Sequence, residues 1–243
     1  NANSTNTDIL DISSRVLNLS GSGTPLTVTS KGTLTVTSSS IKYSGSSATT
    51  IAGTTYNNLD IGTDSDALTG VTYTLGGNAT SSSVTLGNAN STNNDVFDLS
   101  TRLLNLSGSG TPLNITSKGT FTASTSVVKY IGSSATTVTG GITYNGLEIG
   151  TDSDALTGVT YTLGANATTS SLTIGHANST NTDTFDISSR LLNLSGSGTP
   201  LSITSKGAVT LTSSTVKYIG SSATTVTGGL TYSSLELGTD SDG

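Results

Sequence analysis

The sequence predicts an all-β chain that folds as a parallel β-helix, or β-solenoid. Three observations carry this prediction: a long internal repeat, short segments in which apolar and polar residues alternate, and turn-forming residues between those segments. Thr and Val favour strands, whereas Gly and Asn favour turns. No stretch shows the apolar spacing of a helix, so we expect no helix.

The chain of 243 residues consists of three copies of one unit. Residues 1–87 align with residues 88–175, and residues 176–243 form a third, shortened copy, so the period is about 87 to 88 residues. The third copy has no counterpart of residues 155–175. We expect the three copies to be three repeats of one continuous solenoid.

Residues 100–112 show how the unit is built, and they recur almost unchanged as residues 13–25 and 188–200. Leu104 and Leu106 alternate with polar neighbours, which is the pattern of a half-buried strand. A Gly-Ser-Gly corner then ends the strand, and a proline fixes the entry to the next one. The unit is therefore expected to alternate strands and tight corners.

Pairs of apolar residues spaced by two mark the expected strands in chain order. Ser, Gly, Asn or Asp separates the pairs, as expected for short strands between turns. Each unit would then hold three or four coils of about 22 to 26 residues. In the first copy the pairs are Leu10 and Ile12, Leu17 and Leu19, Leu26 and Val28, Leu34 and Val36, Ile41 and Tyr43, Leu59 and Ile61, Tyr73 and Leu75, and Val84 and Leu86.

One of these pairs changes size between copies in a way that indicates a packed interior. The first member becomes larger where the second becomes smaller, and the Thr between them does not change. This fits two inward side chains that flank an outward one. The pair is Leu34 and Val36 in the first copy, Phe121 and Ala123 in the second, and Val209 and Leu211 in the third.

A chain of separate β-sandwiches is the alternative architecture. Immunoglobulin-like sandwiches need large aromatic core residues, and this chain has three Phe and no Trp. Its inward residues are mostly Leu, Val and Ile, which suit a thin interior. The solenoid is therefore the favoured interpretation.

Composition excludes several classes of protein. Without cysteine the chain has no disulfide and no Cys-based metal site, and no apolar run approaches the roughly 18 residues of a membrane span. The net charge of −6 and the spread of the nine basic residues argue against nucleic acid as a partner. The chain begins at Asn1 without Met or a visible signal peptide, so we expect a mature, excised or partial chain.

Residues 128–149 carry a resemblance to a repeat of very long bacterial surface and secreted proteins. In that repeat a Tyr-x-Gly-x-x-Ala-x-x-Val stretch precedes Thr-Tyr-Asn-x-Leu, and the match recurs at residues 41–61 and 216–237, with Ser233 in place of the Asn. Those proteins resemble filamentous-haemagglutinin-type adhesins. The resemblance covers about a quarter of each unit. It implies a right-handed parallel β-helix in an extracellular or cell-surface stalk, adhesin or fibre, and it brings no catalytic residues.

A Gly-Thr-Asp-Ser-Asp segment, present once in each copy, is the candidate metal site. Carboxylates two residues apart in a loop can share a calcium ion with backbone carbonyls. No further acidic ligand follows at a suitable spacing, and an Asx-type turn at a corner is the favoured explanation of the segment. We expect no cofactor, with calcium as the one alternative. Its candidate ligands are Asp64, Asp66, Asp152, Asp154, Asp240 and Asp242.

Two sets of tyrosines occupy equivalent places in the three copies and are candidate ligand-binding residues. Exposed aromatic rings can stack on the faces of sugars, whereas the simpler interpretation packs each ring at a coil corner with its hydroxyl at the surface. The sets are Tyr43, Tyr130 and Tyr218, and Tyr56, Tyr144 and Tyr232.

An enzyme is not expected. Asp8, Asp11 and Arg15 recur in each copy, and a glycosidase would need two carboxylates facing one cleft at a set separation. Repetition of the same charges indicates a structural ion pair instead. The single histidine, His176, replaces Asn88 of the second copy, which is typical of a surface substitution.

Two further surface functions were considered. Alternating threonines such as Thr33, Thr35 and Thr37 are similar to the arrays of ice-binding solenoids, but they are too patchy to favour that function. Asn-x-Ser/Thr triplets are candidate glycosylation sites, although chance produces many in so polar a chain. These are Asn3, Asn18, Asn78, Asn90, Asn105, Asn166, Asn178 and Asn193.

The predicted function is structural: an extracellular β-solenoid that makes a stalk, a fibre shaft or a filament. No cap composition is visible near either end, and solenoids normally need polar caps. The expected partner is another copy, stacked head to tail, or the neighbouring repeats of a longer chain. An adhesin-type module that recognises a glycan or a cell surface is the alternative, and neither nucleic acid nor membrane insertion is expected.

Overall fold

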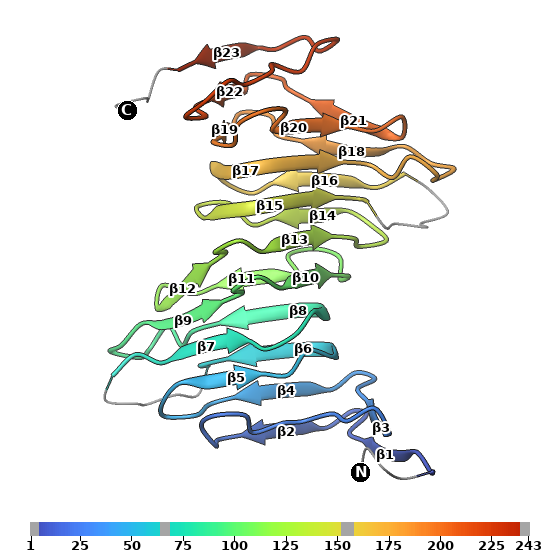
Figure 1. The fold of residues 1–243 in the computed structure, drawn as a ribbon, viewed down its shortest axis with the longest axis vertical. Coiled ribbons are helices and arrows are strands. Elements are labelled where there is room, and N and C mark those ends of the chain that lie inside the picture. Colours follow the sequence, from blue (N-terminus) through green and yellow to red (C-terminus); the bar gives the residue numbers. More distant parts are fainter. Residues whose placement is uncertain (1–4, 64–68, 152–157, 239–243) are drawn as a thin grey trace. The chain divides into compact units, whose positions relative to one another are not determined.

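A computed structural model describes residues 5–63, 69–151 and 158–238 of the chain. These residues form no helix, and the chain folds as a parallel β-solenoid of about eight turns, which confirms the predicted fold class. No helix among the described residues is long and apolar enough to cross a membrane. Figure 1 shows the short strands of successive coils lying one above another.

The chain divides into two compact units, which do not coincide with the three sequence copies. The first unit comprises residues 1–104 and 113–122, and the second comprises residues 105–112 and 123–243. Strand β10 (Leu103–Leu106) has residues in both units. The division of the chain into three solenoid repeats stays a prediction.

In the first unit, strands of successive coils pair in parallel. One series runs β2–β4–β6–β8–β11, a second runs β5–β7–β9–β12, and β1 pairs with β3. The strands are β1 (Asp8–Asp11), β2 (Val16–Leu19), β3 (Gly32–Thr35), β4 (Ser40–Tyr43), β5 (Thr49–Ile51), β6 (Thr55–Ile61), β7 (Thr72–Leu75), β8 (Ala79–Leu86), β9 (Asp95–Asp98), β11 (Leu113–Ile115) and β12 (Gly119–Thr122).

The second unit repeats this arrangement. One series runs β13–β15–β17–β19–β22–β23, β20 also pairs with β17, and a second series runs β14–β16–β18–β21. The strands are β13 (Val127–Tyr130), β14 (Thr136–Val138), β15 (Thr143–Ile149), β16 (Thr160–Leu163), β17 (Ala167–Ile174), β18 (Asp183–Asp186), β19 (Leu191–Leu194), β20 (Leu201–Ile203), β21 (Gly207–Thr210), β22 (Thr215–Tyr218) and β23 (Ser234–Leu237).

Apolar side chains stack in columns because the strands pair in parallel register. In the first unit Ile41, Leu59, Val84 and Leu113 are successive partners, each at most 1% exposed. Burying one such side chain stabilises the fold by about 1.5–3 kcal/mol. This column is aliphatic, as predicted, but the largest fully buried side chains of the described residues are Tyr and Phe, so the interior is more aromatic than predicted.

The corner before β2 and its equivalents needs a residue with positive φ. Ser14 and Ser189 take φ values of 57° and 61°. The second copy has Thr101 at this place, and there the positive φ moves to the preceding Ser100, at 55°. A β-branched side chain fits the left-handed region poorly, so Ser100 takes the positive φ instead. The turn itself stays in place, because the Arg102 amide donates to the Leu99 carbonyl as the Arg15 amide donates to that of Ile12.

Equivalent residues of successive copies do not lie in the same column. In the second unit Val128 belongs to a column with Leu147 and Leu172, on the C-terminal half of β17. Its third-copy equivalent, Val216, pairs with Leu192, which lies against the N-terminal half of β17. One copy is therefore not a whole number of coils, and equivalent side chains of these two copies do not stack into a single row.

Candidate functional site at the first coil

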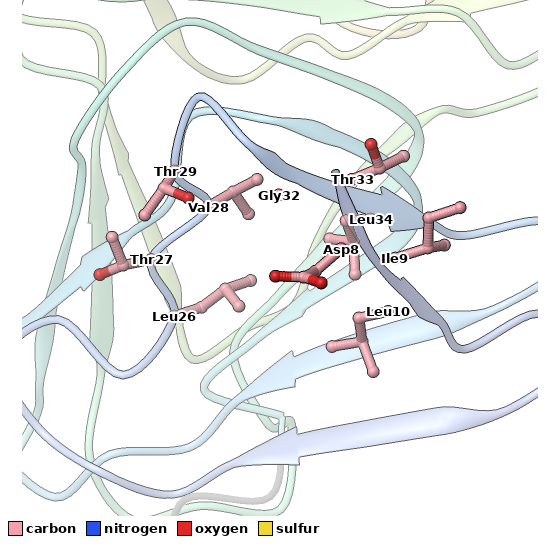
Figure 2. Close-up of a pocket in the computed structure, with 10 residues that line it drawn as sticks. All are labelled: Asp8, Ile9, Leu10, Leu26, Thr27, Val28, Thr29, Gly32, Thr33 and Leu34. Carbon is pink, nitrogen blue, oxygen red and sulfur yellow. The ribbon is translucent and has the colours of Figure 1, made fainter. Parts of the chain in front are cut away.

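A pocket of about 300 Å³ opens at the first coil of the first unit, between β1 and residues 26–29. Leu10, Leu26 and Leu34 line it, and Asp8 stands among them. Figure 2 shows the Asp8 carboxylate pointing into the space between β1 and Leu26. A smaller hollow of about 200 Å³ shares Leu26, Thr27 and Val28 with this pocket. The opening is thus apolar with one carboxylate.

The apolar side chains around this opening are unusually exposed. Ile9, Leu10 and Val16 have 69%, 50% and 59% of their surface exposed. Strand β1 pairs with β3 alone, and β2 pairs with β4. No described residue lies in register on the other edge of β1. Residues 26–28 form no strand, although their equivalents form β11 and β20.

The equivalent strands of the second unit show what usually covers this surface. Strand β18 pairs with β16, β19 pairs with the N-terminal half of β17, and β20 pairs with its C-terminal half. Phe185, the equivalent of Leu10, is 0% exposed, and Leu201, the equivalent of Leu26, is 2% exposed. A single coil, β16–β17, therefore pairs with β18, β19 and β20. Their first-copy equivalents, β1, β2 and residues 26–28, have no such covering coil among the described residues.

The equivalents of Asp8 are buried hydrogen-bond acceptors. Asp183 Oδ1 accepts a bond of 2.7 Å from the backbone amide of Val159, and Asp95 Oδ1 accepts one of 2.9 Å from Val71. Burial raises the pKa of both carboxyls, and the bond from the amide opposes this shift. In both copies the carboxyl accepts a hydrogen bond from the backbone amide of the residue just before the covering strand.

The tyrosines predicted as ligand-binding residues lie in the interior as hydroxyl pairs. Three pairs form, between Tyr43 and Tyr56, Tyr130 and Tyr144, and Tyr218 and Tyr232, with O···O distances of 3.1, 2.9 and 3.2 Å. Tyr232 is half-buried, whereas the other five rings are at most 4% exposed. Buried rings offer no face to a sugar, so this placement gives no support to a ligand role for them.

Each pair closes a small ring of hydrogen bonds with one backbone position. The Thr139 amide donates to the Tyr130 hydroxyl at 3.1 Å, and the Tyr144 hydroxyl donates to the Thr139 carbonyl at 2.6 Å. The proton of Tyr144 is used in that bond, so Tyr130 is the donor to Tyr144. Burial raises the pKa of both tyrosines. The expectation of hydroxyls at the surface is wrong for this pair, because the interior supplies all of their partners.

The Asp-Ser-Asp segments cannot be judged from the structure. Asp64, Asp66, Asp152, Asp154, Asp240 and Asp242 all lie outside the described residues. Within the described part of the chain, no group of three or more His, Asp or Glu side chains is arranged to hold a metal ion. The calcium site stays a prediction.

Asp11 and its equivalents, the second set of repeated carboxylates, act at corners. Asp11, Asp98 and Asp186 accept bonds of 2.9, 2.8 and 2.9 Å from the backbone amides of the serines two residues later. These are Asx-type turns, which lead into β2, β10 and β19. Outward charged pairs also join neighbouring coils: Lys129 with Glu148 at 2.9 Å, and Lys217 with Glu236 at 2.8 Å. The ion pair expected from the repeated Asp and Arg residues stays a prediction.

The candidate glycosylation sites differ in exposure. Asn3 lies outside the described residues, and Asn105 and Asn193 are only half-exposed. The exposed members are Asn18, Asn78, Asn90, Asn166 and Asn178. Asn78 and Asn166 accept bonds of 3.0 and 2.9 Å from the amides of Leu103 and Leu191. Those two asparagines have a structural use, and glycosylation stays a prediction for the whole set.

Comparisons with known proteins identify no relative. No protein-family model, no curated protein and no solved structure matches this chain.

Proposed function

We propose that the protein is an extracellular structural element, a stalk, a fibre shaft or a filament, whose length comes from the stacking of coils. The observation that carries the proposal is the continuity of parallel pairing within each unit. In the second unit β13, β15 and β17 pair in one parallel register, in which β15 and β17 skip a single position, Asn145. Such a stack resists extension because many backbone hydrogen bonds share the load.

The chemistry of the stack also supports a load-bearing role. The interior columns are mostly aliphatic or aromatic, with a few buried Ser and Thr such as Ser81 and Thr169, and ion pairs join neighbouring coils on the outside. Candidate site residues serve the fold: the tyrosines bind one another, and the corner aspartates cap turns. We expect no enzymatic activity and no bound cofactor.

The partner and the location belong to the same proposal. The resemblance to filamentous-haemagglutinin-type repeats supports an extracellular or cell-surface location, and the exposed apolar residues of the first coil support contact with another coil. That coil would come from a second copy or from neighbouring repeats of a longer chain. A glycan-binding role would need an exposed aromatic surface, which the buried tyrosines do not supply.

Electron microscopy of the purified protein at low concentration tests this function. Uniform filaments with an axial layer spacing of about 4.8 Å would support a self-stacking fibre. Isolated short particles would restrict the function to one segment of a stalk. Compact globular beads with no axial repeat would contradict a role in making length.

A further inference from the structure

One coil of fixed sequence pattern covers the equivalents of the first coil wherever the structure describes them. In the second unit β16–β17 covers β18, β19 and β20. In the first unit β7 covers β9, and β8 covers β11. The two covering coils share the pattern Val-Thr-Tyr-Thr-Leu-Gly, then Asn-Ala-Thr, then an apolar residue, Thr and a second apolar residue. In both copies, therefore, the same sequence pattern pairs with the same set of equivalent strands.

We propose that the opening at the first coil binds an extended segment of this covering pattern, which adds as a further coil against β1, β2 and residues 26–28. The proposal rests on the coil-stacking function above and names the partner's chemistry. The partner is a strand–corner–strand segment like residues 159–174, supplied by a separate chain in which that coil is not already covered, since β16–β17 of this chain already pairs with β18, β19 and β20.

The backbone contacts of the added coil follow from those in the second unit. There the amides of Thr184, Ser195 and Thr204 donate to the carbonyls of Val159, Thr169 and Ile174 at 2.8, 2.9 and 3.0 Å. The Pro200 carbonyl accepts from Leu172 at 2.7 Å.

The corresponding groups of the opening are the amides of Ile9, Ser20 and Thr29 and the carbonyl of Pro25. By sequence position they are three donors and one acceptor, and residues 26–28 would have to become a strand, as their equivalents do in β11 and β20.

Two side-chain contacts give the opening its selectivity. Tyr161 is the register partner of Phe185, so the partner's tyrosine would lie over Leu10 and fill the apolar pocket. Asp183 accepts the amide of Val159, so Asp8 would accept the amide of the partner's first valine. Asp8 is exposed in this structure, and burial under the added coil would make that bond stronger.

The opposite end of another copy fits this opening less well. Strand β23 is the equivalent of β15, and β15 pairs with β13 and β17, never with a strand of the β18 or β19 type. If β23 of one copy stacked directly on β1 and β2 of another, it would pair strand types that do not pair within the described part of the chain. Stacking in the native register needs a coil of the β16–β17 pattern between them.

A labelled peptide with the sequence of residues 159–175, added to the whole protein, tests the proposal. We expect saturable binding, seen by fluorescence anisotropy, and slower hydrogen exchange at the amides of Ile9, Ser20 and Thr29. Leu10→Asp should abolish binding, because it places a charge under the partner's tyrosine. Asp8→Ala should weaken binding about tenfold, through loss of a charge-assisted bond. A scrambled peptide should not bind.

Leu237→Asp is the matched control, since Leu237 is 57% exposed on β23 and lies outside the opening. Peptide binding should be unchanged in this variant. Binding that is equal in Leu10→Asp and in the unaltered protein would overturn the proposal. So would self-association that Leu10→Asp abolishes and the peptide does not displace, because a second copy would then occupy the opening directly.

A free peptide loses conformational entropy when it binds, and this loss can prevent detectable binding. A covalently fused coil avoids most of that loss and is therefore a second test. A variant with residues 155–175 copied in front of Asn1 should slow exchange at the same three amides by about tenfold or more. Absence of both peptide binding and this protection would contradict the proposal. These readouts do not depend on filaments, so a failure of the shaft function in electron microscopy remains distinguishable.

Discussion

Residues 8–19 and residues 183–194 carry almost the same sequence in two different surroundings. They differ only where Ile9, Leu10 and Val16 become Thr184, Phe185 and Leu191. Strand β1 is exposed along its whole length, whereas β18 alternates buried and half-buried residues. The difference lies in the covering coil: β18 has β16 on one edge and β21 on the other, and β1 pairs with β3. Burial in this fold is decided by the neighbouring coil as well as by the residue itself.

The largest effect should come from removing an equivalent side chain in the two surroundings. Phe185→Ala should lower the free energy of unfolding by about 3–5 kcal/mol, because it leaves a cavity under Tyr161. Leu10→Ala should lower it by less than about 1 kcal/mol, because the side chain is already half exposed. Urea unfolding followed by circular dichroism measures both values. Equal losses would contradict the comparison.

The tyrosine pairs extend the comparison to hydrogen bonds. Tyr144→Phe should cost about 1–3 kcal/mol of unfolding free energy, since the Thr139 carbonyl and the Tyr130 hydroxyl lose a buried partner. Tyr232→Phe should cost less, because that hydroxyl is only half-buried and water can replace it. The two variants act as each other's control in the same unfolding experiment. A larger loss for Tyr232→Phe would show that burial does not set the strength of these pairs.

Alkaline pH should act most strongly on the fully buried pair. The pKa of Tyr130 and that of Tyr144 are raised in the folded state, so their stabilising contribution is complete below the unfolded pKa of about 10 and is lost as pH rises above it. Stability should fall by up to about 1.4 kcal/mol per pH unit for each tyrosine.

Urea unfolding at several values between pH 8 and pH 11 measures this slope. In a variant with Tyr130→Phe and Tyr144→Phe the slope should be shallower. An unchanged slope would assign the alkaline effect to other groups.

The smallest effect should come from the outward ion pairs. Lys129→Ala should cost about 0.2–1 kcal/mol, because the pair with Glu148 is partly exposed to solvent. Lys217→Ala, which removes the pair with Glu236, should cost no more than that. Adding salt should reduce the difference between each variant and the unaltered protein. A loss that does not respond to salt would indicate a packing role for the lysine stem.

Much of the fold could be predicted from alternation and repetition. Ile41 and Tyr43 were expected to face inward, and both are 0% exposed. Leu10 was expected inward on the same grounds and is half exposed, because the pattern does not show which coil lies beneath it. The tyrosine sets were recognised as equivalent positions. Their mutual hydrogen bonds depend on two side chains of different strands meeting in the interior, which no spacing rule reports.

The sequence by itself determined that the chain is all β, where the corners lie and which side chains of each strand face inward, because these properties depend on residues close in the chain. The tertiary structure alone decided which segment covers which. Successive partners in one column, Ile41, Leu59, Val84 and Leu113, are 18, 25 and 29 residues apart, so no constant period predicts the pairing. The open edge at β1 follows from the same fact, since a strand edge is satisfied by residues a whole coil away.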